Sequence, residues 1–374
     1  MIFLTLLDII ALILAAIHFG IPLAYYYYMK IKYLNKPWNI KINPNYKPKI
    51  TIIIPTYNEA KFIQQKLDNI HEQDYPREKL EVIVIDSAST DGTPELVKQW
   101  TQKHPEINLK LIQEPERRGK AHALNHALKH VAEDTEIVII TDTDAFWPDK
   151  NTLRKVAKYL SDPQVGAVSC IKKPTGTKTT IEENYRQYYN VLRIAESKAY
   201  STPIFHGELA AYKKKHLLEI GGFPTDIGAD DSHTATKIAL QGHRAITPED
   251  LICTEAIPSQ GYFSWRIRRA QHLIQHFTKT LKTKPKTPKP LKKILKTETY
   301  LHLINPWILL TTTLLLLTSL TLYKSLPALT LLLLGITLLA YKPYRTWIHQ
   351  QLALIIATIR NLHTKELIWT KQTK

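Results

Sequence analysis

Long apolar segments lie near both ends of the chain. Residues 2–24 contain a single charged side chain, Asp8, and the segment is longer than the ~20 residues that cross the hydrocarbon core of a bilayer. Four tyrosines follow, and then Lys30 and Lys32, which is typical of the flank of a membrane helix. A cleaved signal peptide has a basic start and a shorter apolar core. The pattern therefore predicts an uncleaved transmembrane helix over residues 1–28.

The second apolar region falls into two parts. Residues 300–323 carry no charge, Lys324 interrupts the run, and residues 325–341 are again apolar. This pattern predicts two spans joined by a tight turn. Residues 347–359 mix aliphatic side chains with polar ones, which favours a helix at the membrane interface, although a further span also fits. We therefore expect a transmembrane hairpin and an interfacial helix within residues 299–374.

The middle of the chain alternates two kinds of periodicity. Short runs of apolar and β-branched residues occur at 49–54, 81–85, 109–112 and 137–140. Segments with helical spacing separate them, at 59–70, after residue 93 and at 121–130. Near-continuous apolar strands that alternate with helices indicate a mostly parallel sheet covered on both faces. The pattern predicts an α/β domain over residues 48–260, with ligands bound beyond the carboxyl ends of the strands.

Composition narrows the class of protein. The chain has 374 residues, of which 44% are hydrophobic, so it is not intrinsically disordered. Two cysteines exclude a disulfide-stapled secreted scaffold and argue against a Cys-rich zinc site. With 50 Lys and Arg against 33 Asp and Glu, the net charge is +17. That charge could indicate a nucleic-acid partner.

The placement of the lysines offers another explanation for the charge. Eight lysines interleaved with prolines lie within residues 279–296, just before the second apolar region. They predict a basic, extended linker on the cytosolic face, which either is simply solvated or binds anionic headgroups. Residues 261–298 are thus expected to form an interfacial amphipathic helix and this linker. The α/β domain of an integral membrane protein would then be cytosolic, with membrane lipids and no nucleic acid among its partners.

Acidic residues follow three of the predicted strands. Glu59 comes after the first strand, Asp86 after the second, and Asp142 and Asp144 after the fourth. The chain has neither the glycine fingerprint of a dinucleotide fold nor a P-loop, so the chemistry is expected from carboxylates. Alternate strand residues point the same way, which would let Asp142 and Asp144 share one divalent cation, Mg or Mn. Taken alone, such a pair is more often a solvated turn.

Several motifs in order give the chain a family resemblance. They are Pro55-Thr56-Tyr57-Asn58-Glu59, residues 86–93, Arg118-Gly119-Lys120-Ala121, Asp142-Thr143-Asp144, His206-Gly207-Glu208 and Gly228-Ala229-Asp230-Asp231. Over about residues 48–275 this series resembles the nucleotide-sugar glycosyltransferases of family 2, which have the GT-A fold. Apolar segments on both flanks make it similar to the membrane-bound, cellulose-synthase-like branch. The resemblance implies a GT-A domain with a mostly parallel mixed sheet, flanked by transmembrane and interfacial helices.

The resemblance also implies roles for single residues. Donor binding would fall to Pro55, Thr56, Tyr57, Glu59, Asp86, Arg118, Lys120, Asp142 and Arg266. A metal ion would be held by Asp142 and Asp144, and the acceptor side would include His206, Gly207 and Asp230. Asp231 would be the catalytic base and Arg269 a second catalytic residue. For Asp231 the alternative is a helix N-cap.

One signature of the branch is altered. Processive members carry Q-x-x-R-W, whereas this chain has Arg266 and Ala270 on either side of Arg269. The arginines would suit a diphosphate or a lipid phosphate, and they also fit a basic interfacial helix. Without the tryptophan, addition of a single sugar is favoured over polymer synthesis. The aromatic and basic helix expected at residues 180–200 would either floor the acceptor site or pack in the core.

These features lead to one expected function and two alternatives. We expect an inverting, metal-dependent glycosyltransferase that moves a single hexose, mannose or glucose, with GDP-mannose favoured by the resemblance. The acceptor would be lipid-linked, such as a polyprenyl phosphate or a lipid-linked oligosaccharide, in glycan precursor synthesis at the cytosolic membrane face. The alternatives are a processive polysaccharide synthase and a non-catalytic scaffold that binds anionic lipid. The sequence leaves the oligomeric state open.

Overall fold

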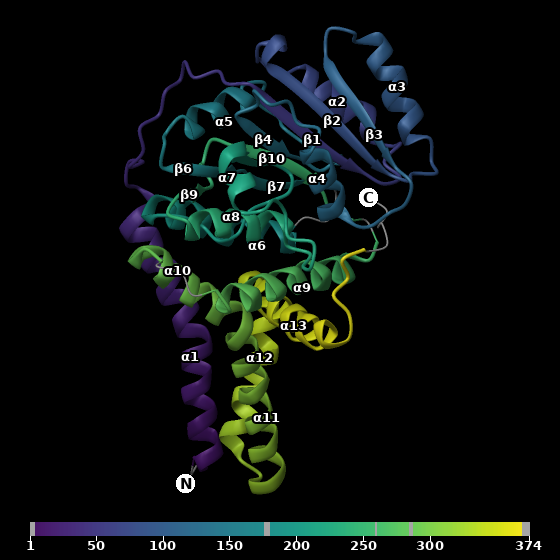
Figure 1. The fold of residues 1–374 in the computed structure, drawn as a ribbon. Helices are drawn as coiled ribbons and strands as arrows, with labels where there is room; N and C mark the ends of the chain where they lie inside the picture. Colours follow the sequence, from purple (N-terminus) through teal and green to yellow (C-terminus); the bar gives the residue numbers. More distant parts are fainter. Residues whose placement is uncertain (1–3, 176–179, 259, 284–286, 369–374) are drawn as a thin grey trace.

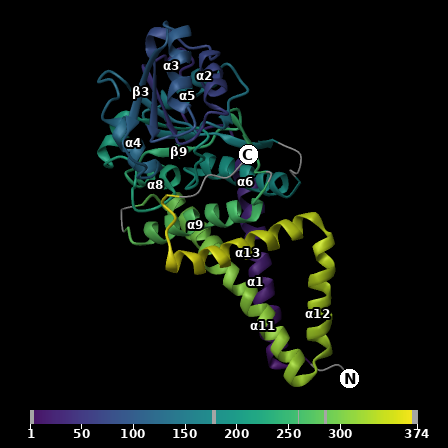
Figure 2. The same cartoon turned by 90° about the vertical axis from the view of Figure 1, so that its right-hand side faces the viewer.

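An α/β domain sits on a stalk of long helices (Figures 1 and 2). The computed structural model describes residues 4–175, 180–258, 260–283 and 287–368. Three helices, α6 (Thr180–Ala199), α9 (Tyr262–Leu281) and α13 (Lys342–His363), lie between the domain and the stalk.

The domain is built on a seven-stranded sheet with the order β3-β2-β1-β4-β8-β6-β9. Its strands are β1 (Ile50–Thr56), β2 (Leu80–Ser87), β3 (Asn108–Glu114), β4 (Ile137–Ile140), β6 (Val165–Ser169), β8 (Ala210–Lys213) and β9 (Arg244–Ile246). The first four are parallel, as predicted, and β8 runs antiparallel to both of its neighbours. A second sheet contains β5 (Ala145–Phe146), β10 (Ile252–Ala256) and β7 (Ile171–Thr175).

Alternation along the strands divides the core between the two faces of the large sheet. Ile52 and Ile54 pack against α2 (Ile63–His71), α3 (Thr93–Lys103) and α5 (Thr152–Leu160). Ile53, on the opposite side of β1, packs with α4 (Lys120–Leu128), α7 (Lys214–Glu219) and α8 (Asp230–Leu240). Both faces are therefore covered, which is why the strands are apolar throughout.

The stalk contains two helical segments whose length and composition suit a membrane span. The first joins α1 (Leu6–Met29) to the π-helical turn η1 (Lys30–Leu34). The second joins α10 (Lys289–Thr299), η3 (Tyr300–Ile304) and α11 (Asn305–Tyr323). The segment formed by α12 (Leu326–Thr337) and η4 (Leu338–Ala340) meets α13 at a bend of 108° and passes the same test only together with it.

Two expectations about the membrane region change or stay open. Residues 289–299 form helix α10, with Pro290 in its first turn, so the predicted extended linker is wrong over that range. Residues 284–286 of the lysine-rich run lie outside the described residues. Helix α13 runs across the ends of the stalk helices and packs on α9 (Figure 2). Its position at the membrane interface stays a prediction.

Candidate active site

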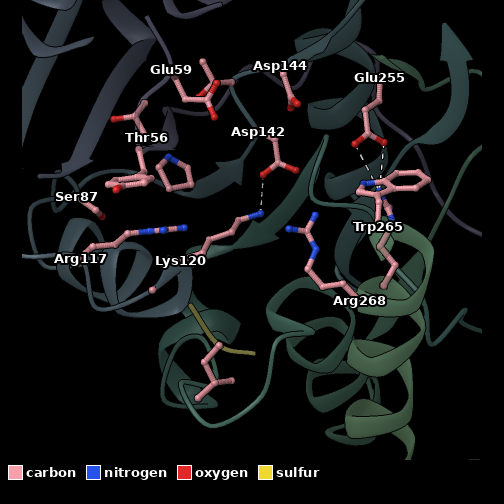
Figure 3. Close-up of a pocket in the computed structure, with 16 residues that line it drawn as sticks. Thr56, Glu59, Ser87, Arg117, Lys120, Asp142, Asp144, Glu255, Trp265 and Arg268 are labelled. Carbon is pink, nitrogen blue, oxygen red and sulfur yellow. Dashed lines mark hydrogen bonds and ion pairs between the residues drawn. The ribbon is translucent and has the colours of Figure 1, made fainter. Parts of the chain in front are cut away.

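Two adjoining cavities open at the carboxyl ends of the parallel strands, under the cover of α9. The first has a volume of about 200 Å³ and the second about 150 Å³. They share the side chains of Lys120, Asp142, Arg268 and Arg269. In the first, Asp142 and Asp144 lie on one side, and Arg117 and Lys120 face them from the other (Figure 3). A ligand in one cavity can therefore meet a ligand in the other.

The end of β1 and the loop after it form one wall of the first cavity. Pro55, Thr56, Tyr57 and Glu59 all line it, and their predicted contact with the donor stays a prediction. Asp86 is instead buried behind this wall, where it accepts hydrogen bonds from Thr56 Oγ1 at 3.0 Å and from the Ser89 amide at 2.9 Å. Asp86 therefore ties the end of β2 to the end of β1 and does not line either cavity.

Of the two adjacent arginines before α4, Arg117 and Arg118, the one that lines the first cavity is not the predicted one. Arg117 lines the first cavity and stacks on Tyr57, with 3.9 Å between the guanidinium carbon and the ring centroid. Arg118 is half exposed, lies 3.7 Å from Glu114 and borders a smaller cavity behind Gly119. The structure therefore places Arg117, and not the predicted Arg118, in the first cavity. The sequence alone could not distinguish the two adjacent arginines.

Asp142 and Asp144 share the first cavity, but not for the predicted reason. Strand β4 ends at Ile140, so both carboxylates lie in the turn beyond it and strand alternation does not position them. The turn is held by a hydrogen bond from the Asp142 amide to the Gly207 carbonyl at 3.1 Å. Two carboxylates in an open polar cavity are a donor set that fits a hard divalent cation such as Mg²⁺ or Mn²⁺.

Lys120 connects the two acidic groups of the site. Its Nζ donates to Asp142 Oδ1 at 2.6 Å and lies 3.9 Å from Asp230 Oδ2. Although burial lowers it, the pKa of Lys120 is held above its ordinary value by Asp142, Asp230 and Asp231. A Cβ on Gly207 would stand 2.8 Å from this Nζ. Gly207 therefore matters because any side chain there would displace the ion pair.

Asp231 lines the second cavity from the first turn of α8. The helix begins at Asp230 and Ala229 is its N-cap, so the alternative that Asp231 is a helix cap is wrong. Its Oδ1 accepts from the Ser232 amide at 2.6 Å. Burial and then repulsion from Asp230 raise the pKa of Asp231 to about 7, against the attraction of Lys120. A carboxylate with such a pKa can accept a proton near neutral pH.

The other predicted acceptor-side residues also reach the second cavity. His206, Gly207 and Asp230 line it. Burial holds the pKa of His206 well below its ordinary value, so the ring is neutral. Tyr185 and Arg186 of α6 line this cavity too, which places that helix on its wall.

Arg266 lies on the other side of the site from its predicted position. It lines the second cavity, where Nη1 pairs with Glu182 at 2.9 Å and the guanidinium stacks on Tyr185 at 3.8 Å. Its other nitrogen donates to Gln350 of α13. Arg266, predicted to bind the donor, therefore does not line the first cavity with Thr56, Tyr57 and Glu59.

Arg269 belongs to a buried ion-pair network that the sequence did not indicate. Its Nη1 lies 3.2 Å from Glu255 and its Nη2 3.7 Å from Glu208, and both glutamates also pair with Lys172. Trp265 lies beneath Arg269, with 4.8 Å between the guanidinium carbon and the ring centroid. Arg269 is thus held rigidly where the two cavities meet. Among the partners of Arg269 in this network, only Glu208 belonged to a motif that the sequence analysis singled out, His206-Gly207-Glu208.

Comparison with known proteins identifies the family. Residues 51–221 match the family described as "Glycosyl transferase family 2", and residues 137–343 match "Glycosyl transferase family group 2". A solved structure, a mannosyltransferase named PcManGT from Pyrobaculum calidifontis in complex with GDP-Man and Mn²⁺, is 57% identical. The similarity covers 96% of this chain and 99% of that one, with a TM-score of 0.89. The chain belongs to glycosyltransferase family 2.

More distant relatives of this family 2 glycosyltransferase make polymers. Poly-β-1,6-N-acetyl-D-glucosamine synthase of Staphylococcus epidermidis is 26% identical over 73% of this chain and 67% of the relative. The Staphylococcus aureus enzymes of that name are 28% identical over 70% and 64%. The chain thus spans about two thirds of their length. The solved structure of the S. aureus protein TarS with UDP-GlcNAc is 18% identical and has a TM-score of 0.50. The similarity covers 84% of this chain and 93% of that one, and it shows a shared fold alone.

The comparisons settle the predicted class. The fold is a GT-A fold with a mixed sheet, and the enzyme is a hexosyltransferase. The non-catalytic scaffold is therefore set aside. The expectation of a divalent cation agrees with the Mn²⁺ in the similar mannosyltransferase.

Proposed function

We propose that this enzyme transfers a single mannose from GDP-mannose to a lipid-linked acceptor at the cytosolic face of a membrane, using a divalent cation. One observation carries the proposal. Asp231, whose pKa is raised to about 7, lines a cavity that adjoins the one containing Asp142 and Asp144. A base on the acceptor side thus lies next to a cation-binding pair on the donor side.

The donor is assigned from similarity and from the chemistry of the first cavity. The similar mannosyltransferase holds GDP-Man and Mn²⁺, and 57% identity over nearly the whole chain supports the same donor here. A cation held by Asp142 and Asp144 would offset the negative charge of the departing diphosphate. Arg268 and Arg269 line the same cavity and offer guanidinium groups to its oxygens.

The two cavities suit transfer with inversion. Asp231 takes the proton of an acceptor hydroxyl, or orients an acceptor phosphate, while the acceptor oxygen forms a bond to C1 of the sugar. The bond between C1 and the diphosphate oxygen breaks, and its electron pair leaves with the nucleoside diphosphate. Attack from the second cavity on a sugar bound in the first reaches C1 opposite the leaving group. The product therefore has the inverted anomeric configuration.

The surroundings of α13 support a lipid-linked acceptor. Gln350 of this helix lines the second cavity, together with Arg186, Arg266, Arg268 and Arg269. Three other residues of α13, Ile348, Leu352 and Ile355, line an apolar groove of about 470 Å³. Side chains of α1, α11, α12 and η4 line the rest of this groove. Helix α13 thus contributes side chains both to the second cavity, which is rich in arginine, and to the apolar groove. A molecule with a phosphate head and a hydrocarbon chain matches both.

The membrane orientation rests on charge. Two helical segments are long and apolar enough to cross a bilayer. The lysines around α10 lie at the end of the stalk next to the catalytic domain, and basic residues favour the cytosolic side. Nucleotide sugar would then reach the first cavity from the cytosol.

A polysaccharide synthase remains the second candidate, because the Staphylococcus relatives have that activity. Ala270 lines the second cavity at the position where the processive signature has tryptophan. The smaller side chain offers no stacking surface for a growing polymer, which favours the single transfer.

Product analysis separates the two candidates. The purified enzyme is incubated with GDP-mannose, UDP-N-acetylglucosamine or other nucleotide sugars, a lipid extract and Mn²⁺, with EDTA in a parallel sample. Lipid products are read by mass spectrometry. We expect one added hexose, from GDP-mannose only, and no product in EDTA. A ladder of sugars would support the synthase instead, and unchanged activity in EDTA would remove the cation from the proposal.

A further inference from the structure

The chain passes back from the stalk to the catalytic domain after α13. Residues 364–368 leave the end of this helix, cross α9 and reach the turn before α4 (Figures 1 and 2). We call residues 364–368 the C-terminal strap. None of the motifs in the sequence pointed to this segment.

Two glutamines of α9, one helical turn apart, hold the strap by its backbone. Gln271 donates to the carbonyl of Thr364, and Gln275 Nε2 donates to the carbonyl of Lys365 at 2.8 Å. Both glutamines are buried. Gln275 Oε1 also accepts from the amide of Gly228 at 2.8 Å. The same side chain therefore ties the strap to the loop that leads into α8.

The strap ends against the donor cavity. Leu367 lines the first cavity together with Arg117, Gly119 and Lys120. Its carbonyl oxygen would stand 3.2 Å from a Cβ on Gly119, whose φ of +103° also favours glycine. The strap thus packs directly on the turn that carries two basic residues of the site. Leu367 is half-buried, so part of its surface is left for a ligand.

We propose that Leu367 is a donor-positioning residue and that the C-terminal strap forms one wall of the nucleotide-sugar site. The inference rests on the proposed function, because it takes the first cavity as the donor site. Leu367 lines the same cavity as Thr56, Tyr57 and Ser87, which lie at the ends of β1 and β2. Its apolar side chain suits contact with the nucleoside part of the donor, while the cations of the cavity suit the diphosphate.

The strap would also position Arg117 and Lys120 indirectly. The backbone of the strap packs on Gly119, which lies between Arg117 and Lys120, the first residue of α4. Removal of the strap would give this turn more freedom, and two side chains of the donor site would then be less fixed. The effect of losing the whole strap should therefore exceed the effect of losing the leucine side chain.

Nucleotide binding to the full-length enzyme tests the proposal. The variants are Leu367→Ala, a chain that ends at Thr364, and Gln271→Met, which removes one of the two glutamine hydrogen bonds to the strap without changing a residue that lines the cavity. Leu362→Ala is the matched control, because it removes the same atoms from a side chain that is 79% exposed on α13. The measurements are the Kd for GDP with Mn²⁺, the KM for GDP-mannose and the Tm.

We expect Leu367→Ala to raise Kd and KM about five- to tenfold, since ~1.4 kcal/mol of lost contact is tenfold in affinity. The shortened chain and Gln271→Met should raise both, and kcat and Tm should stay close to wild type for Leu367→Ala. Wild-type Kd and KM in Leu367→Ala and in the shortened chain would overturn the inference, as would an equal effect of Leu362→Ala.

The outcome is separable from that of the proposed function. If the wild-type enzyme binds UDP in place of GDP, the donor assignment fails, and the same variants measured with UDP still decide the role of Leu367. If the wild-type enzyme binds no nucleoside diphosphate, both proposals are overturned.

Discussion

Lys120 Nζ lies 2.6 Å from Asp142 Oδ1 and 3.9 Å from Asp230 Oδ2, so one partly buried cation joins the carboxylate of Asp142 to the pair formed by Asp230 and Asp231. Charge in one cavity is therefore felt in the other. Binding of a diphosphate and a metal ion next to Asp142 will change the field at Asp231 through this lysine.

Replacing Lys120 should shift the pH dependence of the reaction. Lys120 lowers the pKa of Asp231, whereas burial, Asp230 and Glu208 raise it, and Tyr212 and Arg269 also lie near enough to interact. In Lys120→Met the pKa of Asp231 should rise above about 7. The acidic limb of the kcat profile should then move by about one unit to higher pH, because the base must be deprotonated. Lys120→Arg is the control that keeps the charge, and an unmoved limb in Lys120→Met would refute this coupling.

Asp231→Asn should slow the enzyme and stabilise it. Loss of a general base lowers kcat by roughly 10²–10⁴-fold. The pKa of Asp231 is about 7 in the folded enzyme and near 3.8 unfolded, so the wild type loses stability as the pH rises from about 4 to 7. Relative to wild type, Asp231→Asn should have a Tm a few degrees higher at pH 8 and little changed at pH 4.

The control for this variant is Asp226→Asn, an exposed carboxylate that pairs with Lys279. It should keep wild-type kcat and should not gain stability at pH 8. Undiminished turnover in Asp231→Asn would remove this residue from the mechanism.

Asp144→Asn should weaken activation by the metal ion. The substitution leaves one carboxylate of the pair, so the Mn²⁺ concentration for half-maximal rate should rise about tenfold or more. Asp149→Asn is a suitable control, because Asp149 lies just beyond the same turn and pairs with Lys155 at 2.6 Å. The experiment is a Mn²⁺ titration after removal of metal with EDTA. Equal titration curves for Asp144→Asn and Asp149→Asn would argue against a metal ligand at residue 144.

Filling the apolar groove should affect the acceptor and not the donor. Gly335 lines the groove, and a Cβ there would have Tyr344 Oη at 3.6 Å as its nearest neighbour, so a larger side chain can enter. Gly335→Leu should raise the KM for a lipid-linked acceptor severalfold and leave the Kd for GDP unchanged. Gly20→Leu, on an exposed position of α1 with nothing within 4 Å, is the control. An unchanged acceptor KM in Gly335→Leu would place the hydrocarbon chain elsewhere.

Periodicity and motifs predicted the parts of the fold that depend on neighbouring residues. The four parallel strands and their helices follow from runs such as residues 81–85, which are buried on both faces. Asp142 and Asp144 were found by their motif, yet the geometry behind the prediction was wrong, because a turn and not a strand carries them. Proline in the lysine-rich run suggested an extended linker, but Pro290 lies in a first helical turn, where proline is tolerated.

Contacts between distant residues could not be predicted in the same way. Lys172 forms ion pairs with both Glu208 and Glu255. The pairing of β7 with β10 in the small sheet brings Lys172 close to Glu255, and the loop at Gly207 places Glu208 beside them. The direction of a side chain was equally hidden. Arg117 and Arg118 are adjacent and chemically identical, and only the backbone before Gly119 decides which one enters the cavity.

The course of the chain to Leu367 links the first cavity to the assembly of the stalk helices. Residues 48–260 contain most of the residues that line the first cavity, but Trp265, Arg268 and Leu367 come from segments outside that range. Leu367 follows α11 and α12 in the sequence, so it can reach the cavity only after both helices have folded back towards the domain. An excised α/β domain would leave one side of the cavity open to water. Under the proposed function, the nucleotide-sugar site would be complete only after α11 and α12 have assembled, which would prevent sugar donor from being consumed away from its acceptor.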